Sequence, residues 1–205
     1  MTTVREFAIA QSGPGGGCTT LGLKGIDQQI VDLLLPVVKN RLISCADLVT
    51  VVGGSTLPLI QTPGRDALAQ AVQEKGEKPK LIHAYRTIAQ QFVLFQWFKK
   101  GKCGIPLAAH PGTSPHEKGI GIDIQEHARW RNVLEKHNWR WRGPADPGHF
   151  TFIGPGVQSN ILTEGVRAFQ RLWNLHNPDD PIKEDGIFGE TETAPRLLES
   201  PAEGF

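Results

Sequence analysis

Residues 114–123 read SPHEKGIGID, and residues 146–150 read DPGHF. Together the two stretches supply two imidazoles and two carboxylates. Neutral imidazole nitrogen and carboxylate oxygen are both zinc ligands, and a catalytic zinc site uses three protein ligands with one position left for water. His116, Asp123 and His149 are therefore candidate ligands for Zn²⁺. The remaining carboxylate, three residues before His149, is suitably placed to accept a proton from that water.

The spacing alone leaves two interpretations open. The patterns H-x6-D and D-x-x-H occur by chance in many proteins, so His116 and His149 could equally be ordinary core or surface imidazoles. Gly119 and Gly121 favour a metal site, because residues without a side chain let the turn close tightly around an ion. Asp146 favours a catalytic site, since a structural zinc needs no spare carboxylate. The absence of HExxH excludes the helical zincin arrangement.

The surrounding sequence predicts helices and short strands without a strict βαβ alternation. Strands are expected at Leu48–Val52, Leu81–Ala84, Ile120–Ile124 and Phe150–Ile153. Helices are expected at residues 26–37, 66–74, 88–98 and 126–137, from Thr163 as N-cap through Trp173, and from Thr193 onward. Trp139 and Trp141 alternate on a strand; they could line a cleft but are more typical of a core. The predicted class is α+β, with flanking helices and a small mixed or antiparallel sheet around a zinc cleft, plus a short helical C-terminal segment.

With 205 residues the chain is long enough for one domain and a small appendage. No apolar run reaches membrane-spanning length, since Asp32 and Pro36 interrupt Ile30–Val38. Met1–Gln11 lacks the apolar stretch of a secretory signal. If the substrate lies outside the cytoplasm, we expect delivery by lysis, by a dedicated secretion system or by a signal absent from this sequence.

The near-zero net charge hides an asymmetry along the chain. Residues 1–155 carry 18 Lys and Arg against 12 Asp and Glu, while residues 156–205 carry 4 against 9. The basic part suits an anionic polymer, although a solvated surface would look the same. The basic residues are scattered and form no dense patch, so a nucleic-acid partner is not expected.

The three cysteines are spaced too irregularly for a CxxC metal site. One disulfide with a leftover thiol is possible among Cys18, Cys45 and Cys103. Three buried free thiols are the favoured interpretation, because nothing in a chain of this size demands a cross-link.

Residues 114–123 resemble the S-x-H-x-x-G-x-A-x-D motif of the VanY-type D-alanyl-D-alanine carboxypeptidases, which are zinc peptidases. Residues 146–150 resemble the second motif of that family. The segment AYRT at residues 84–87, together with Gln90, resembles its arginine-containing segment. The three motifs occur in the family's order within residues 80–154, which makes the resemblance fairly specific.

This resemblance implies a role for each matched residue. The three candidate ligands hold Zn²⁺, and Asp146 is the general base. Arg86 binds the developing oxyanion or a substrate carboxylate, with Ser114 and Gln90 contacting the substrate. The structural alternatives are a salt bridge for Arg86 and a turn or cap for Ser114. Gly121 departs from the usual alanine, a small change that we expect to leave the metal undisturbed.

The C-terminal sequence carries a second resemblance. VRAFQ at residues 166–170, followed by DGIFG at residues 185–189 and Thr191, is similar to the V-x-A-F-Q…D-G-x-x-G-x-x-T pattern of small three-helix peptidoglycan-binding domains. An obvious first helix of such a domain is missing. Residues 156–205 are thus either a truncated binding module packed on the catalytic body or a helical extension without a binding role.

The expected division is residues 1–79 as the N-terminal part of the catalytic body, 80–154 as the zinc peptidase core and 156–205 as the peptidoglycan-binding-like segment. The expected function is a zinc-dependent stem-peptide hydrolase, a D,D-carboxypeptidase or endopeptidase, acting as a monomer on peptidoglycan or muropeptides in the periplasm or outside the cell. One alternative is L,D-specific or amidase-type activity on the same polymer. Another is a non-catalytic wall-binding protein with a structural or vestigial zinc site.

Overall fold

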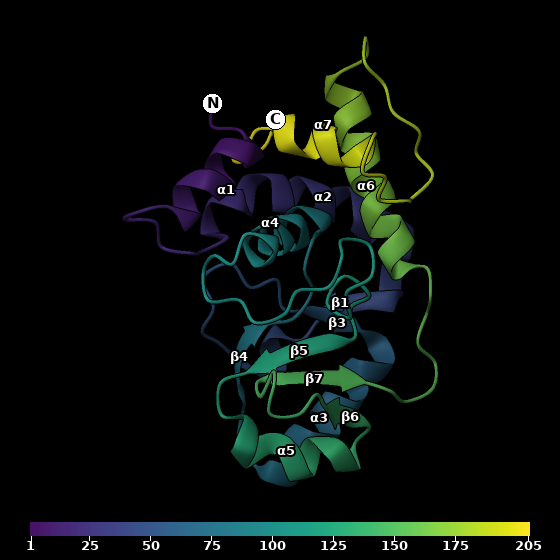
Figure 1. The fold of residues 1–205 in the computed structure, drawn as a ribbon. Coiled ribbons are helices and arrows are strands. Elements are labelled where there is room, and N and C mark those ends of the chain that lie inside the picture. Colours follow the sequence, from purple (N-terminus) through teal and green to yellow (C-terminus); the bar gives the residue numbers. More distant parts are fainter. The chain divides into compact units, whose positions relative to one another are not determined.

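The computed structural model describes residues 1–205 and groups them into two compact units (Figure 1). Unit 1 comprises Met1–Val37, Thr87–Ser114 and Leu162–Phe205, and unit 2 comprises Val38–Arg86 and Pro115–Ile161. Each unit is assembled from segments that are far apart in sequence. The predicted division at residues 80, 154 and 156 follows the sequence alone and stays a prediction.

Unit 2 contains both sheets. The larger has the order β2-β4-β5-β7-β6, and the smaller pairs β1 with β3. The strands are β1 Leu42–Ser44, β2 Thr50–Val51, β3 Leu59–Gln61, β4 Lys80–His83, β5 Gly121–Ile124, β6 Trp139–Trp141 and β7 His149–Phe152. Only the pair β2 and β4 is parallel; the other pairs are antiparallel. The predicted α+β class with a small mixed sheet is confirmed.

Two helices of unit 2, α3 (Thr62–Lys75) and α5 (His127–Lys136), pack against each other and on this sheet. Helix α3 has Pro63 in its first turn and ends at Gly76, whose φ of 72° is the left-handed conformation that favours glycine. The helices and the sheet share one apolar core. Its largest members are Leu68, Trp130, Leu134, Trp139, Phe150 and Phe152. Burial of each such side chain contributes about 1.5–3 kcal/mol to stability. The core therefore holds the central strands β5 and β7 firmly in place.

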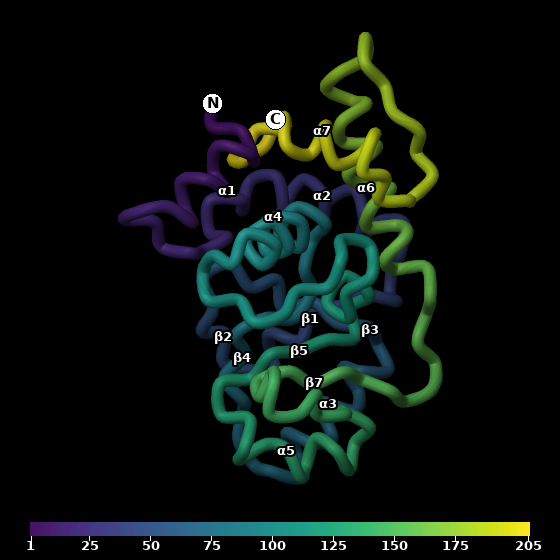
Figure 2. The backbone as a smooth tube through the Cα atoms, in the orientation of Figure 1, coloured from purple at the N-terminus to yellow at the C-terminus, as the bar shows by residue number.

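Unit 1 is helical, with α1 packed against α4 and α7. Its helices are α1 Val4–Ser12, α2 Lys24–Val38, α4 Ile88–Lys99, α6 Ile161–His176 and α7 Thr193–Glu199. The last residue of α2 and the first residue of α6 are assigned to unit 2. A capping box of Thr3 and Glu6 begins α1. The two chain ends lie side by side (Figure 2), where the Ala202 N–H donates to the Thr2 carbonyl.

Gln170 joins α6 to the DGIFG turn in unit 1. Its side-chain N–H group donates to Asp185 Oδ1 at 3.0 Å, and its oxygen accepts from the Gly186 N–H at 2.8 Å. The same amide contacts the hydroxyl of Thr193 at 3.2 Å. Thr193 is buried, whereas Thr191, the residue that the sequence pattern indicated, is exposed.

Three sequence expectations need correction. The strand expected at Leu48–Val52 is only the two-residue β2, preceded by a 3-10 turn at Ala46–Leu48. Thr163 is not the N-cap of α6, because this helix already begins at Ile161. Helix α1 was not expected. Its inward-facing stripe is limited to Val4, Phe7 and Ala8, which is too short to give a clear helical period.

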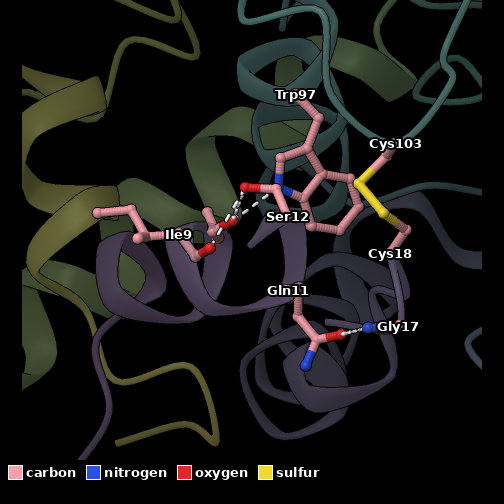
Figure 3. Close-up of a disulfide and its surroundings, with 8 residues drawn as sticks. Ile9, Gln11, Ser12, Gly17, Cys18, Trp97 and Cys103 are labelled. Atoms are coloured by element: carbon pink, nitrogen blue, oxygen red, sulfur yellow. Dashed lines mark hydrogen bonds between the residues drawn. A yellow bond between two sulfur atoms is a disulfide. The ribbon is translucent and has the colours of Figure 1, made fainter. Parts of the chain in front are cut away.

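The favoured interpretation of three free thiols is wrong. Cys18 and Cys103 form a disulfide across 85 residues of chain, and Cys45 is the free, buried cysteine. The disulfide lies beside the contact of α1 with α4, where the Trp97 indole N–H donates to the Ala8 carbonyl at 2.8 Å (Figure 3). Burial raises the pKa of the Cys45 thiol to about 12, which makes it an inert core residue.

Candidate active site

The candidate ligands lie on adjacent elements of unit 2. Asp123 on β5 and His149 on β7 are direct partners in the antiparallel register. His116 lies in the turn that leads into β5. The sheet thus places one imidazole opposite one carboxylate, and the turn returns the second imidazole to them.

Three ligand atoms converge in this cluster. His149 Nδ1 lies 2.9 Å from Asp123 Oδ1 and 3.1 Å from His116 Nε2, and the latter lies 3.4 Å from Asp123 Oδ1. Tetrahedral zinc with its usual bond lengths separates neighbouring nitrogen and oxygen ligands by about 3.3 Å. The three atoms therefore form a triangle of the size that one face of a tetrahedral zinc site requires. The residues present fit a zinc ion.

The other nitrogen of each imidazole also has a partner. His116 Nδ1 lies 2.7 Å from the Ala84 carbonyl, and His149 Nε2 lies 2.9 Å from Thr151 Oγ1. The Ala84 carbonyl can only accept, so His116 carries its proton on Nδ1 and its Nε2 lone pair faces the cluster. Such bonds fix the orientation of metal-binding histidines and increase their basicity.

The turn between His116 and β5 depends on two glycines. A Cβ at Gly119, whose φ is 68°, would lie 2.6 Å from a methyl group of Leu42. A Cβ at Gly121 would lie 3.1 Å from the His116 backbone nitrogen. The buried Gln61 holds the same turn: its side chain donates to the Lys118 carbonyl at 2.7 Å. The alanine usual in the resembling family would thus crowd His116 here.

Arg86 follows β4 and lies beside the cluster. Its backbone N–H donates to the His116 carbonyl at 3.3 Å. Together with the bond between His116 Nδ1 and the Ala84 carbonyl, this gives two hydrogen bonds between the arginine segment and the turn that carries His116. Its guanidinium Nη2 lies 3.7 Å from Asp123 Oδ2. This salt bridge does not use the Asp123 oxygen that faces the two imidazoles.

Charges in the cluster favour the ligand forms of its side chains. Burial alone would raise the pKa of Asp123, but His116, His149 and Arg86 outweigh it and hold that pKa well below its usual range. Burial lowers the pKa of His116, which keeps the ring neutral despite the opposing effect of Asp123. An ionised carboxylate and neutral imidazoles are the states that bind a metal ion.

Asp146 is held in the loop between β6 and β7. Its side chain is 38% exposed and lies 3.8 Å from Arg142 Nε. Burial lowers the pKa of the Arg86 guanidinium, and the charges of Asp123, Glu117 and Asp146 oppose this shift. Asp146 thus lies within electrostatic reach of Arg86. It is a solvent-accessible carboxylate at the edge of a buried cluster.

The remaining predicted site residues lie in unit 1. Ser114 is buried at the last position before the chain enters unit 2. The side chain of Gln90 donates to Asp27 Oδ2 at 2.6 Å, and the hydroxyl of Thr87 donates to Asp27 Oδ1 at 2.5 Å. Within unit 1, Gln90 therefore serves a buried hydrogen-bond network at the start of α4. Substrate contact by Ser114 or Gln90 stays a prediction.

Two titratable neighbours of the cluster, His83 and Glu117, were not among the predicted site residues. His83 on β4 is the register partner of Asp123. Burial, followed by the charge of Arg86, lowers the pKa of His83 to about 4, so the ring is neutral near pH 7. Glu117 is buried, and its charge opposes the lowering of the Arg86 pKa. The register shift in β4 between Leu81 and His83 breaks the alternation that would have indicated His83.

Unit 2 is therefore an α+β unit with a candidate mononuclear metal site of two imidazoles and one carboxylate, next to a largely buried arginine and an accessible second carboxylate. The family model described as VanY, D-alanyl-D-alanine carboxypeptidase, matches residues 62–142. This range includes Arg86, His116 and Asp123 but ends before Asp146 and His149. No curated protein and no solved structure matches the chain.

The match covers less than half of the chain and confirms the sequence resemblance over that range. The C-terminal pattern resembling a peptidoglycan-binding domain lies outside the matched residues and stays a prediction. None of the helices is long and apolar enough to cross a membrane.

Proposed function

We propose that this protein is a zinc-dependent hydrolase of peptidoglycan stem peptides, with D,D-carboxypeptidase or endopeptidase specificity. The observation that carries the proposal is the triangle of His116 Nε2, Asp123 Oδ1 and His149 Nδ1, whose sides of 2.9 to 3.4 Å suit tetrahedral zinc. The similarity to the VanY family model over residues 62–142 supports the substrate class.

His116, Asp123 and His149 would hold the ion, which when bound supplies Lewis-acid chemistry and lowers the pKa of water from 15.7 to about 7. Asp146 would accept the proton of the attacking water on its carboxylate and deliver it to the leaving amine. Its partial exposure lets it meet both water and substrate.

Arg86 would stabilise the negative charge that develops on the scissile carbonyl oxygen, or bind the terminal carboxylate of the substrate. Its guanidinium remains charged despite burial, because arginine does not lose its proton in proteins. The guanidinium is a planar fork of N–H donors, a geometry that matches a carboxylate or an oxyanion. Because the guanidinium is already held in position, it need not reorient as negative charge develops on the substrate during the reaction.

The decisive experiment combines metal analysis with product analysis. We expect about one zinc per chain. We also expect mass spectrometry to show that the protein releases the terminal D-alanine from a defined pentapeptide muropeptide. Loss of an internal fragment instead would indicate an endopeptidase or an L,D-specific or amidase-type enzyme. Full turnover after chelation, or zinc binding without turnover on any muropeptide, would refute the proposal; the second result would favour a wall-binding protein with a structural zinc.

The disulfide Cys18–Cys103 supports action outside the cytoplasm, in the periplasm or beyond the cell. Disulfides persist in oxidising compartments and are rare where glutathione and thioredoxin keep thiols reduced.

We further propose that the C-terminal segment binds the same polymer. In unit 1 a hollow of about 240 Å³ is lined by apolar and charged side chains of α1, α4, α7 and the DGIFG turn. Its lining includes Phe92, Phe95 and Phe188, the cations Arg5 and Lys99, and the carboxylate of Glu190, which lies 3.2 Å from His110 Nε2. Aromatic faces suit sugar rings, and two cations suit the carboxylates of muropeptides.

Surface substitutions test this binding proposal better than a deletion. Removing residues 156–205 would take α7 away from α1 and the C-terminal strand bridge away from Thr3, so we expect insoluble protein. Changing both Arg5→Gln and Lys99→Gln should lower pelleting with purified sacculi severalfold and leave hydrolysis of soluble muropeptides unchanged. Lys102→Gln, an exposed cation outside the hollow, is the matched control. Equal pelleting of both proteins would refute a binding role for this hollow.

A further inference from the structure

The segment that carries Asp146 is held by the Asp146 N–H, which donates to the Gly143 carbonyl at 3.2 Å, and by three hydrogen bonds to its own carbonyls. The carbonyls of Asp146–Gly148 accept, in order, from the His149 N–H at 3.1 Å, the Trp141 indole N–H at 2.8 Å and the Ile124 N–H at 2.9 Å. Two of these donors are backbone groups. The indole of Trp141 is the one side chain in the set, so a substitution at this residue removes one anchor without altering the backbone.

Trp141 is itself well fixed. It lies at the end of β6, opposite Phe150 in the register with β7. The guanidinium carbon of Arg131 on α5 lies 4.0 Å from the centre of the indole ring, a cation–π contact. The direction of the Trp141 indole N–H is therefore fixed by strand β6 and by the contact of Arg131 with the face of the ring.

We propose that Trp141 is a positioning residue for Asp146, an inference that rests on the proposed function. Pro147 has no backbone N–H, so its carbonyl is the only backbone polar group that this residue can use to fix the turn. The bond from Trp141 holds the turn next to the carboxylate, while β5 and β7 hold its other end at Gly148 and His149. Without the indole N–H, the turn is still held at Gly148 and His149. It loses the hydrogen bond to the Pro147 carbonyl, next to Asp146.

The expected consequence is a loss of turnover without a loss of metal. A displacement of a reacting group by about 1 Å can cost roughly 100-fold in rate. We expect Trp141→Phe to lower kcat by about 10- to 100-fold. KM should change little, because Trp141 acts through Asp146 and not on the substrate. Zinc content should equal that of the wild type, since His116, Asp123 and His149 keep their own partners.

Trp139 supplies a matched control on the same strand. Its indole N–H is buried and has no hydrogen-bond partner, so Trp139→Phe shrinks the ring without removing a hydrogen bond. It is expected to lower the thermal stability through lost packing and to leave kcat near the wild-type value. Equal kcat losses in Trp141→Phe and Trp139→Phe would overturn the proposal and indicate only a structural role.

A second measurement does not depend on activity. Amide hydrogen exchange of Asp146, Gly148 and His149 should accelerate severalfold in Trp141→Phe and not in Trp139→Phe, because only the first variant loosens the turn. Unchanged exchange in Trp141→Phe would also overturn the proposal. If the wild type hydrolyses no muropeptide while this exchange difference is present, the proposed function fails and the anchoring role of Trp141 stands.

A double-substitution cycle completes the test. In an Asp146→Ala background, Trp141→Phe should cause no further loss of the residual rate, because the group that it positions is gone. A multiplicative loss in the double variant would mean that Trp141 acts independently of Asp146 and would refute the proposal.

Discussion

His116 Nε2 and His149 Nδ1 lie 3.1 Å apart in the interior of unit 2. When each ring donates from its other nitrogen, to Ala84 and Thr151, the two facing nitrogens both present lone pairs. Two lone pairs at this separation repel each other unless a cation or a proton lies between them. The ionised Asp123, 2.9 Å from His149 Nδ1, adds to the demand for a positive charge. A bound divalent cation satisfies all three groups together.

Ligand and base substitutions should separate metal binding from turnover. His116→Ala removes one corner of the triangle, so we expect loss of both zinc and hydrolysis. Asp146→Asn keeps the ligands and the approximate shape of the loop, so we expect wild-type zinc content with turnover reduced by about 100- to 10,000-fold. Zinc measured by elemental analysis and product release from a muropeptide check both statements. Loss of zinc in Asp146→Asn would identify this residue as a ligand instead of a base.

Arg86 should not tolerate conservative replacement. Arg86→Lys keeps the positive charge near Asp123 but loses the planar array of donors, so we expect kcat/KM to fall by about 100-fold with zinc retained. The half-exposed Arg142, which faces Asp146 across 3.8 Å, offers the control Arg142→Lys with an expected effect below about 3-fold. Comparable losses in the two variants would remove the special role that we assign to Arg86.

The site was more predictable than the packing around it. Residues 116, 123, 146 and 149 belong to two short motifs whose ligand types and glycines can be recognised locally. Asp123 and His149 then meet because β5 and β7 are antiparallel neighbours. Gln61 could not be foreseen, because it reaches the turn from a different strand, 57 residues away along the chain.

Unit 1 was the least predictable part. It is built from three separated segments, so neither its membership nor the Cys18–Cys103 pairing follows from local sequence. Helix α1 is stabilised largely by its contacts with α4 and α7 and by its capping box, and tertiary contacts of this kind override a weak amphipathic pattern. The helices α2 and α4 were predictable because their apolar residues repeat at helical spacing over about three turns.

The disulfide should carry a large part of the stability of unit 1. It closes 85 residues of chain, and in the chain-entropy account a loop of this length is worth roughly 4–5 kcal/mol. The double variant Cys18→Ser, Cys103→Ser should therefore unfold at clearly lower urea concentration. Thiol titration of the wild type should find no reactive thiol in the folded state and one after denaturation, namely Cys45. Three titratable thiols in the denatured, unreduced wild type would contradict the pairing.

Asp27 should make the protein less stable as the pH rises. Burial raises the pKa of Asp27 to about 7 from its ordinary value of 3.8, although the hydrogen bonds from Thr87 and Gln90 act in the opposite direction. Between these two values the unfolded chain has released the proton that the folded chain still holds. The free energy of unfolding therefore falls with rising pH across this window, by up to about 1.4 kcal/mol per pH unit, and is constant with respect to this group above it.

Asp27→Asn tests this linkage, because an amide mimics the protonated carboxyl: its oxygen can accept from Gln90 and its N–H group can donate to the Thr87 hydroxyl. Relative to the wild type, we expect the variant to gain stability between pH 4 and pH 8 in urea denaturation. Asp32→Asn, an exposed change on the same helix, should leave the pH dependence unaltered. Parallel pH profiles for Asp27→Asn and the wild type would show that Asp27 is already ionised in the folded protein at low pH, which the depth of its burial argues against.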